Sequence, residues 1–94
     1  MSTIVFGDFE WNEAKAASNL AKHGISFIEA ADALADPYEV LLADSLDESR
    51  VLSLVLSPVI RVLLVVSIVR GVRIRLISAR KATPHEERIY QEKR

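Results

Sequence analysis

The chain has 94 residues, enough for one hydrophobic core but too few to divide between two, so the sequence predicts a single domain over residues 1–94. Half of the residues are apolar and 27% are charged, an ordinary globular composition that argues against a disordered chain. The absence of cysteine excludes disulfides and thiolate metal sites, and a cytoplasmic location fits best.

The formal net charge of −1 conceals a strong asymmetry between the two halves of the chain. Residues 1–48 carry a net charge of −8, whereas residues 49–94 carry +7. Two interpretations of this asymmetry stay open. Either the basic half binds a polyanion, or the two halves neutralise each other through intramolecular ion pairs.

The most apolar region, residues 51–69, is nearly long enough to span a membrane. Arg61 lies near its middle, and a central arginine costs about 3 kcal/mol in lipid even on permissive scales. Pro58 and the many valines and isoleucines favour two buried strands joined by a turn. The N-terminus lacks the basic and apolar regions of a signal peptide, so we expect no export and no membrane contact.

Residues 4–6 form a short apolar run that predicts a first strand. Asn12 can cap a helix over residues 13–23, and Gly24 can close it in the left-handed conformation. The polar stripe of this helix is Lys15, Asn19, Lys22 and His23. The face expected to pack on the core has small residues beside a tryptophan: Trp11, Ala14, Ala17 or Ser18, and Ala21.

A second helix is signalled by Ser26 and Glu29, which have the spacing of a capping box, and it ends before Pro37. Its apolar face is Phe27, Ala30, Ala31 and Leu34. The rest of the chain reads mainly as strands, over residues 39–43, 50–57, 61–69 and 72–79. Thr83, Pro84 and Glu86 then predict a last helix. The predicted class is α+β, with helices on one face of a mostly antiparallel sheet of four to five strands.

The basic residues of the last strand are the first candidates for a functional site. Arg73 and Arg75 share one strand face, about 7 Å apart, which is near the spacing of adjacent phosphates on an extended nucleic acid. Arg80 and Lys81 follow, and Arg61 can join them from the neighbouring strand. Such a group could bind phosphates and stabilise a charged transition state. The alternative is a solvated face whose arginines pair with the acidic half.

Other polar residues have weaker signals. His23, at a helix C-terminus beside Lys22, could act as a general acid or contact a phosphate, or it could merely bond the last carbonyls. Glu48 could act as a general base if its loop folds over the sheet. Tyr90 reads as a packing residue with a polar tip. Two histidines do not make a metal site, so we expect no metal and no cofactor.

Several segments of the sequence resemble the BrnT family of toxins. They are residues 9–15, 19–24 and 27–31 with Asp36-Pro37 near the start, and residues 73–83 with Glu86, Glu87, Arg88 and Tyr90 near the end. The resemblance implies a RelE-like fold and a metal-independent ribonuclease that halts translation as the toxin of a type II toxin–antitoxin system. In such enzymes the ribose 2′-hydroxyl attacks the adjacent phosphate, which restricts cleavage to RNA.

The resemblance also implies roles for particular residues. Arg75 and Arg80 would bind the scissile phosphate, and Lys22 and His23 would supply a cation and a proton donor if the first helix borders the sheet face. Glu48 and Tyr90 are further catalytic candidates, and the RNA-binding candidates are Arg61, Arg73, Lys81 and Lys15.

The implied partner is a BrnA-like ribbon-helix-helix antitoxin, in a toxin–antitoxin heterotetramer or beside a toxin homodimer. The chain departs from the family at residues 57–60, where Ser-Pro-Val-Ile stands in place of a glycine-containing turn. An alternative function is therefore a non-catalytic module that binds the antitoxin without cleaving RNA.

Overall fold

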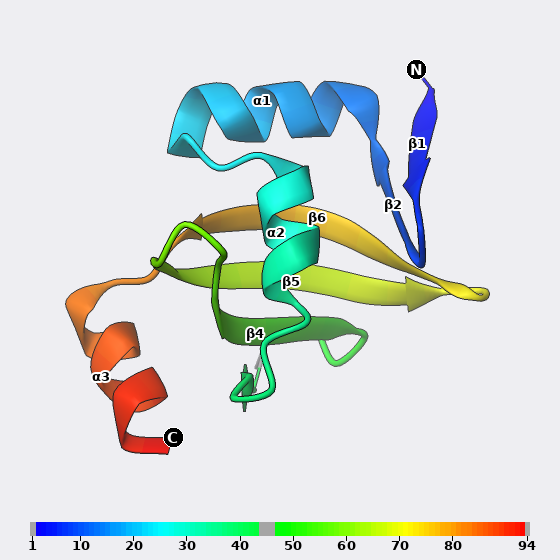
Figure 1. Ribbon diagram of the computed structural model, residues 1–94. Helices are drawn as coiled ribbons and strands as arrows, with labels where there is room; N and C mark the ends of the chain where they lie inside the picture. The colour runs from blue at the N-terminus through cyan, green and yellow to red at the C-terminus, as the bar shows by residue number, and fades with distance from the viewer. Residues whose placement is uncertain (1, 44–46, 94) are drawn as a thin grey trace.

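The computed structural model describes residues 2–43 and 47–93 and arranges them as six strands and three helices (Figure 1). In chain order the elements are β1 (Thr3–Phe6), β2 (Phe9–Asn12), α1 (Glu13–His23), α2 (Phe27–Ala33), β3 (Val40–Leu42), β4 (Arg50–Leu56), β5 (Val62–Arg70), β6 (Arg73–Lys81) and α3 (Pro84–Lys93). The α+β class is confirmed, and the sheet has more strands than the four to five that we predicted. No helix of the described ranges is long and apolar enough to cross a membrane.

One six-stranded sheet has the order β1-β2-β6-β5-β4-β3. All neighbouring strands are antiparallel except β2 and β6, which run parallel. The sequence prediction missed β2, which pairs with β1 through a two-residue turn in which Gly7 has a φ of +59°. Because β2 pairs with β6, the N-terminal hairpin lies beside a strand more than 60 residues away in the chain.

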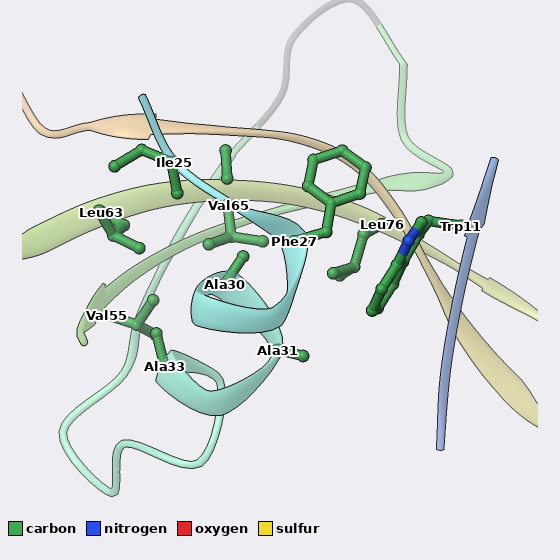
Figure 2. Packing of buried hydrophobic residues seen from close by; sticks show 11 residues of the cluster. Trp11, Ile25, Phe27, Ala30, Ala31, Ala33, Val55, Leu63, Val65 and Leu76 are labelled. Atoms are coloured by element: carbon green, nitrogen blue, oxygen red, sulfur yellow. The ribbon is translucent and has the colours of Figure 1, made fainter. Parts of the chain in front are cut away.

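Helices α1 and α2 cover one face of the sheet, which we call the helix face (Figure 1). The main core cluster lies between α2 and this face, and Figure 2 shows its side chains gathered around that helix. Its buried members are Trp11, Ile25, Phe27, Ala30, Ala31, Ala33, Val55, Leu63, Val65, Leu76 and Ala79. The predicted apolar face of the second helix is thus confirmed.

The packing face of α1 differs from the prediction. Asn19, assigned to the solvated polar stripe, is buried, whereas Ala17 and Ala21 are exposed. The Asn19 amide nitrogen donates to the carbonyls of Ile25 (3.0 Å) and Ala79 (2.8 Å), and its oxygen accepts from the Ala79 amide (3.1 Å). A buried polar side chain is tolerated when its hydrogen bonds are made, and here those bonds attach α1 to β6.

Helix α3 lies on the other face of the sheet, so the prediction of all helices on one face is wrong. Tyr90, from α3, is fully buried in a second cluster with Leu54, Val62 and Leu64. These strand residues alternate with Val55, Leu63 and Val65 of the first cluster and therefore point to the opposite face. The sheet buries apolar side chains on both of its faces.

The predicted helix ends hold, with one exception. Asn12 accepts from the Lys15 amide, and Gly24 closes α1 in the left-handed conformation. Thr83 and Glu86 form the complete capping box at the start of α3. At α2, Ser26 accepts from the Glu29 amide, but the Glu29 carboxylate turns away from the helix end.

The β4–β5 connection contains a strained residue. Ile60 has a φ of +61°, and within the described ranges it is the only residue other than glycine with a positive φ. Its side chain is 78% exposed. A residue with a Cβ in this region loses about 1–2 kcal/mol, and a β-branched residue is among the least tolerant. This is the position where the resemblance led us to expect a glycine-containing turn.

We expect Ile60→Gly to stabilise the protein by about 1 kcal/mol, because strain is relieved and no buried contact is lost. The free energy of unfolding in urea measures the effect. Val59→Gly is the matched control, since Val59 is also exposed but has no positive φ, and it should lower stability. Equal effects of the two substitutions would contradict strain at Ile60.

Candidate functional site

The face of the sheet opposite α1 and α2 carries a group of arginines, and we call it the arginine face. Arg75 of β6 lies opposite Ile68 of β5, which in turn lies opposite Arg50 of β4. On its other side Arg75 lies opposite Glu10 of β2. Residues directly opposite each other on neighbouring strands point to the same face, so these side chains form one row across four strands.

Two further rows complete the arginine face. Arg70 and Arg73 lie opposite each other at the end of the β5–β6 hairpin, two residues beyond the row of Arg75. Arg80 lies opposite Leu64, which belongs to the cluster beneath α3. Arg73 and Arg75 thus share a face, as the alternation along the strand predicted.

A β-bulge brings Arg75 and Arg80 to the same face. Two residues five positions apart point to opposite faces of a regular strand. The register of β6 shifts here, because Ser78 lies opposite Val66 while Leu76 lies opposite Ser67, and Ile77 has no counterpart on β5. The extra residue reverses the alternation, as bulges do. Leu76 and Ala79 consequently both reach the helix-face core, and the two arginines both reach the other side.

Each of these two arginines is held by a carboxylate. Arg75 donates to Glu10 at 2.6 Å, and both side chains are largely covered. Arg80, 37% exposed, donates with two nitrogens to both oxygens of Glu86, at 2.8 and 3.0 Å. Glu86 also accepts from the Thr83 amide, and the hydrogen bonds from Arg80 keep the pKa of Glu86 below its usual value. These contacts order both guanidinium groups, one of them in bidentate geometry.

Arg61 does not join the arginine face, contrary to our expectation. It lies on the helix face, where its guanidinium binds the Glu29 carboxylate at 2.6 and 2.8 Å. This bond lowers the pKa of Glu29. The interpretation of mutual neutralisation is therefore partly confirmed, since Glu29–Arg61 and Glu10–Arg75 each join the acidic and basic halves.

The predicted cation and proton donor lie away from the arginine face. Lys22 and His23 are exposed at the end of α1, on the opposite side of the sheet, so the first helix does not border the arginine face. Figure 1 shows that end of α1 on the same side of the molecule as the end of β6. Lys81, the last residue of β6, is exposed there as well.

The remaining predicted residues occupy separate places. Glu48 is exposed in the turn before β4, two residues before Arg50, and Lys15 is exposed on the first turn of α1. Tyr90 is fully buried, and its hydroxyl donates to the Asp36 carboxylate at 2.5 Å. The interpretation of Tyr90 as a packing residue with a polar tip is confirmed, and a group buried in this way is not presented to a ligand on the surface.

Sequence reasoning missed three residues of this face: Glu10, Arg50 and Arg70. Glu10 was missed because β2 was missed, although Gly7-Asp8 between two short apolar segments is a recognised hairpin signal. Once β2 is placed, Glu10 alternates with Phe9 and Trp11 and must point away from the helix-face core.

The arginine face can bind a polyanion and stabilise negative charge. Several guanidinium groups on one face of a sheet, beside the carboxylates of Glu10 and Glu86, suit phosphate chemistry. Among the described residues no group of three or more histidine, aspartate or glutamate side chains could hold a metal ion. Fold and face together define a small α+β protein whose sheet carries an arginine-rich face.

The family of the chain follows from its comparison with known proteins. Residues 11–86 match the family model described as "Ribonuclease toxin, BrnT, of type II toxin-antitoxin system". The match covers most of the sequence, and the chain belongs to the BrnT toxin family.

A solved structure agrees with this assignment. The crystal structure of the ribonuclease toxin BrnT from Brucella abortus superposes with a TM-score of 0.63 at 22% sequence identity, covering 78% of this chain and 92% of that one. At this identity the likeness shows a shared fold. No curated protein gives a significant match.

Proposed function

We propose that the chain is a metal-independent endoribonuclease that cleaves RNA in the cytoplasm and so inhibits translation. The observation that carries this proposal is the bulge at Ile77, which gathers Arg75 and Arg80 on one face of the sheet. Both arginines belong to the segment that resembles the closing motif of the family. A single domain of residues 1–94 would supply the whole site.

In this proposal Arg75 binds the scissile phosphate. The ribose 2′-oxygen forms a bond to phosphorus while the bond from phosphorus to the 5′-oxygen breaks, which leaves a 2′,3′-cyclic phosphate and a 5′-hydroxyl. Arg75 stabilises the negative charge that develops on the phosphoryl oxygens. Water supplies the proton that the leaving 5′-oxygen takes.

Glu10 is the candidate general base for the 2′-hydroxyl proton. One of its oxygens accepts from Arg75, and the other has no hydrogen bond within the described ranges. Glu86 is less suited, because both of its oxygens are occupied by Arg80. A base must lie within hydrogen-bonding reach of the proton that it removes, and Glu10 lies beside the arginine assigned to the phosphate.

Arg80 is proposed to hold a different phosphate from Arg75. Arg75 and Arg80 lie opposite Ile68 and Leu64, which are four positions apart on β5, so their α-carbons are roughly 13 Å apart at the usual rise of a strand. We assign Lys22, His23 and Lys81, near the end of β6, to the RNA backbone beyond Arg80. Arg61 is already paired with Glu29, and Lys15 lies at the far end of α1 from His23, so neither is needed in this path.

The proposed partner is a BrnA-like ribbon-helix-helix antitoxin. Membership of a type II toxin family implies an antitoxin partner and an RNA substrate. A partner that covers the arginine face would block the RNA path directly. We propose a heterotetramer of two toxin and two antitoxin chains as the neutral form.

A second candidate function is a non-catalytic module that binds the antitoxin without cleaving RNA. It is favoured by the position of Lys22 and His23, which leaves the arginine face without the proton donor that the resemblance implied. The ion pairs with Glu10 and Glu86 also neutralise the two central arginines.

The experiment that separates the two functions is incubation of partner-free protein with mixed RNA in EDTA. We expect the parent to cleave RNA and the Arg75→Ala/Arg80→Ala double variant to leave it intact. Circular dichroism establishes that both proteins are folded. No cleavage by the folded parent would favour the non-catalytic module, and cleavage by the folded double variant would remove both arginines from the site.

A further inference from the structure

The Arg70–Arg73 pair at the tip of the β5–β6 hairpin has no explanation in the fold. The two arginines lie directly opposite each other, with α-carbons about 5 Å apart, and like charges so placed destabilise a hairpin. No carboxylate within the described ranges forms an ion pair with either of them. Arg75 and Arg80, by contrast, each have a carboxylate partner.

The hairpin tip is also open to solvent. Arg70 is exposed and Arg73 is half-buried, and the neighbouring Val72 is 91% exposed. Helix α3 packs over Leu54 and Leu64, at the opposite end of the sheet from the hairpin (Figure 1). Two guanidinium groups at an open hairpin end can therefore reach an external anion.

The position of Arg70 and Arg73 relative to Arg75 indicates which anion they bind. Arg73 is two residues from Arg75 on the same face, about 7 Å away along β6. This is close to the distance between neighbouring phosphates on an extended single strand. The pair thus continues the line of Arg80 and Arg75 toward the hairpin tip.

We propose that Arg70 and Arg73 form a phosphate-binding subsite for the RNA nucleotide next to the scissile phosphate, on the hairpin side. The inference rests on the proposed function, since it takes RNA as the ligand of the arginine face. Binding energy at this subsite offsets the like-charge repulsion in the free protein. The enzyme then requires at least one phosphate on that side of the cleavage point.

The test is the salt dependence of binding to a labelled 2′-O-methyl octanucleotide, which has no free 2′-hydroxyl and cannot be cleaved. Each phosphate contact to a single strand contributes about 0.7 to the slope of log K against log salt. We expect Arg70→Gln/Arg73→Gln to reduce the slope by about 0.7, because the two arginines together bind one phosphate. Between 50 and 200 mM KCl the loss of affinity should then be about 2.6-fold smaller than in the parent.

The matched control is Arg88→Gln/Lys93→Gln, which removes the same charge from exposed positions of α3. Its slope should equal that of the parent. An unchanged slope in the hairpin variant, or equal reductions in the two variants, would overturn the subsite. In that case we would assign Arg70 and Arg73 to the binding of an acidic protein partner.

A cleavage assay distinguishes this inference from the proposed function. If the parent cleaves RNA and the hairpin variant has the same salt slope as the parent, the subsite alone is wrong. A parent that binds the analogue but cleaves no RNA means that the proposed chemistry is wrong, while the slopes still decide the subsite.

Discussion

An Arg75→Ala variant is expected to lower kcat for RNA cleavage about 10²- to 10³-fold, with a smaller change in KM. Removing one preorganised group that stabilises transition-state charge costs about 2.7–4 kcal/mol. Arg80→Ala should instead raise KM about tenfold and leave kcat nearly unchanged, because a contact made equally in the ground state and the transition state contributes only to binding. Steady-state kinetics on a single-site RNA substrate measures both constants.

The two variants also test the distance between the arginines. Equal losses of kcat would mean that both guanidinium groups reach the same phosphate across the roughly 13 Å between their α-carbons. An unchanged kcat in Arg75→Ala would exclude Arg75 from the reacting centre. Arg88→Ala is the control, since Arg88 is exposed on α3. Thermal unfolding of Arg75→Ala is needed as well, because that substitution leaves Glu10 without its partner.

Local signals in the sequence predicted the helix boundaries well. Asn12 and Gly24 bracket α1, and Thr83 with Glu86 begins α3, as expected. A cap depends on residues three or four positions apart, so its chemistry is complete within a short segment. The exception at Glu29 has a distant cause, because its carboxylate binds Arg61, 32 residues away.

Features that depend on distant pairing were not predictable in this way. The parallel pairing of β2 with β6 joins residues about 65 positions apart, and no local pattern announces it. The packing face of α1 was misassigned because the polarity of Asn19 suggested solvent. Its amide instead satisfies the backbone of β6, which becomes visible only after the helix is placed on the sheet.

The bulge had the largest consequence for the candidate site. Strict alternation along β6 would place Arg75 and Arg80 on opposite faces of the sheet. The sequence around Ile77 contains no glycine or other residue that indicates a bulge. The resemblance to the BrnT family indicated Arg75 and Arg80 together, and the register of the sheet explains how both side chains come to lie on one face. Arg70 could be assigned to the arginine face only from the register of β5 and β6, which places it opposite Arg73.

The largest effect on stability is expected for Asn19→Ala, at about 3 kcal/mol or more. The substitution removes three hydrogen bonds and leaves the buried backbone groups of Ile25 and Ala79 without partners, and each such group costs about 1–3 kcal/mol. The better helix propensity of alanine offsets only about 0.7 kcal/mol. For a domain of this size the midpoint of thermal unfolding should fall by about 12–24 °C.

Ser18→Ala is the matched control for this prediction, because Ser18 is the preceding residue of α1 and is exposed. Its effect should stay within about 0.5 kcal/mol. A loss below 1 kcal/mol for Asn19→Ala would mean that packing by α2 alone holds the helix layer on the sheet. A large loss would make Asn19 the link that fixes α1 to the bulged end of β6. The position of the β6 segment that carries Arg80 on one face of the sheet would then depend on α1, which is bonded to Ala79 on the other face.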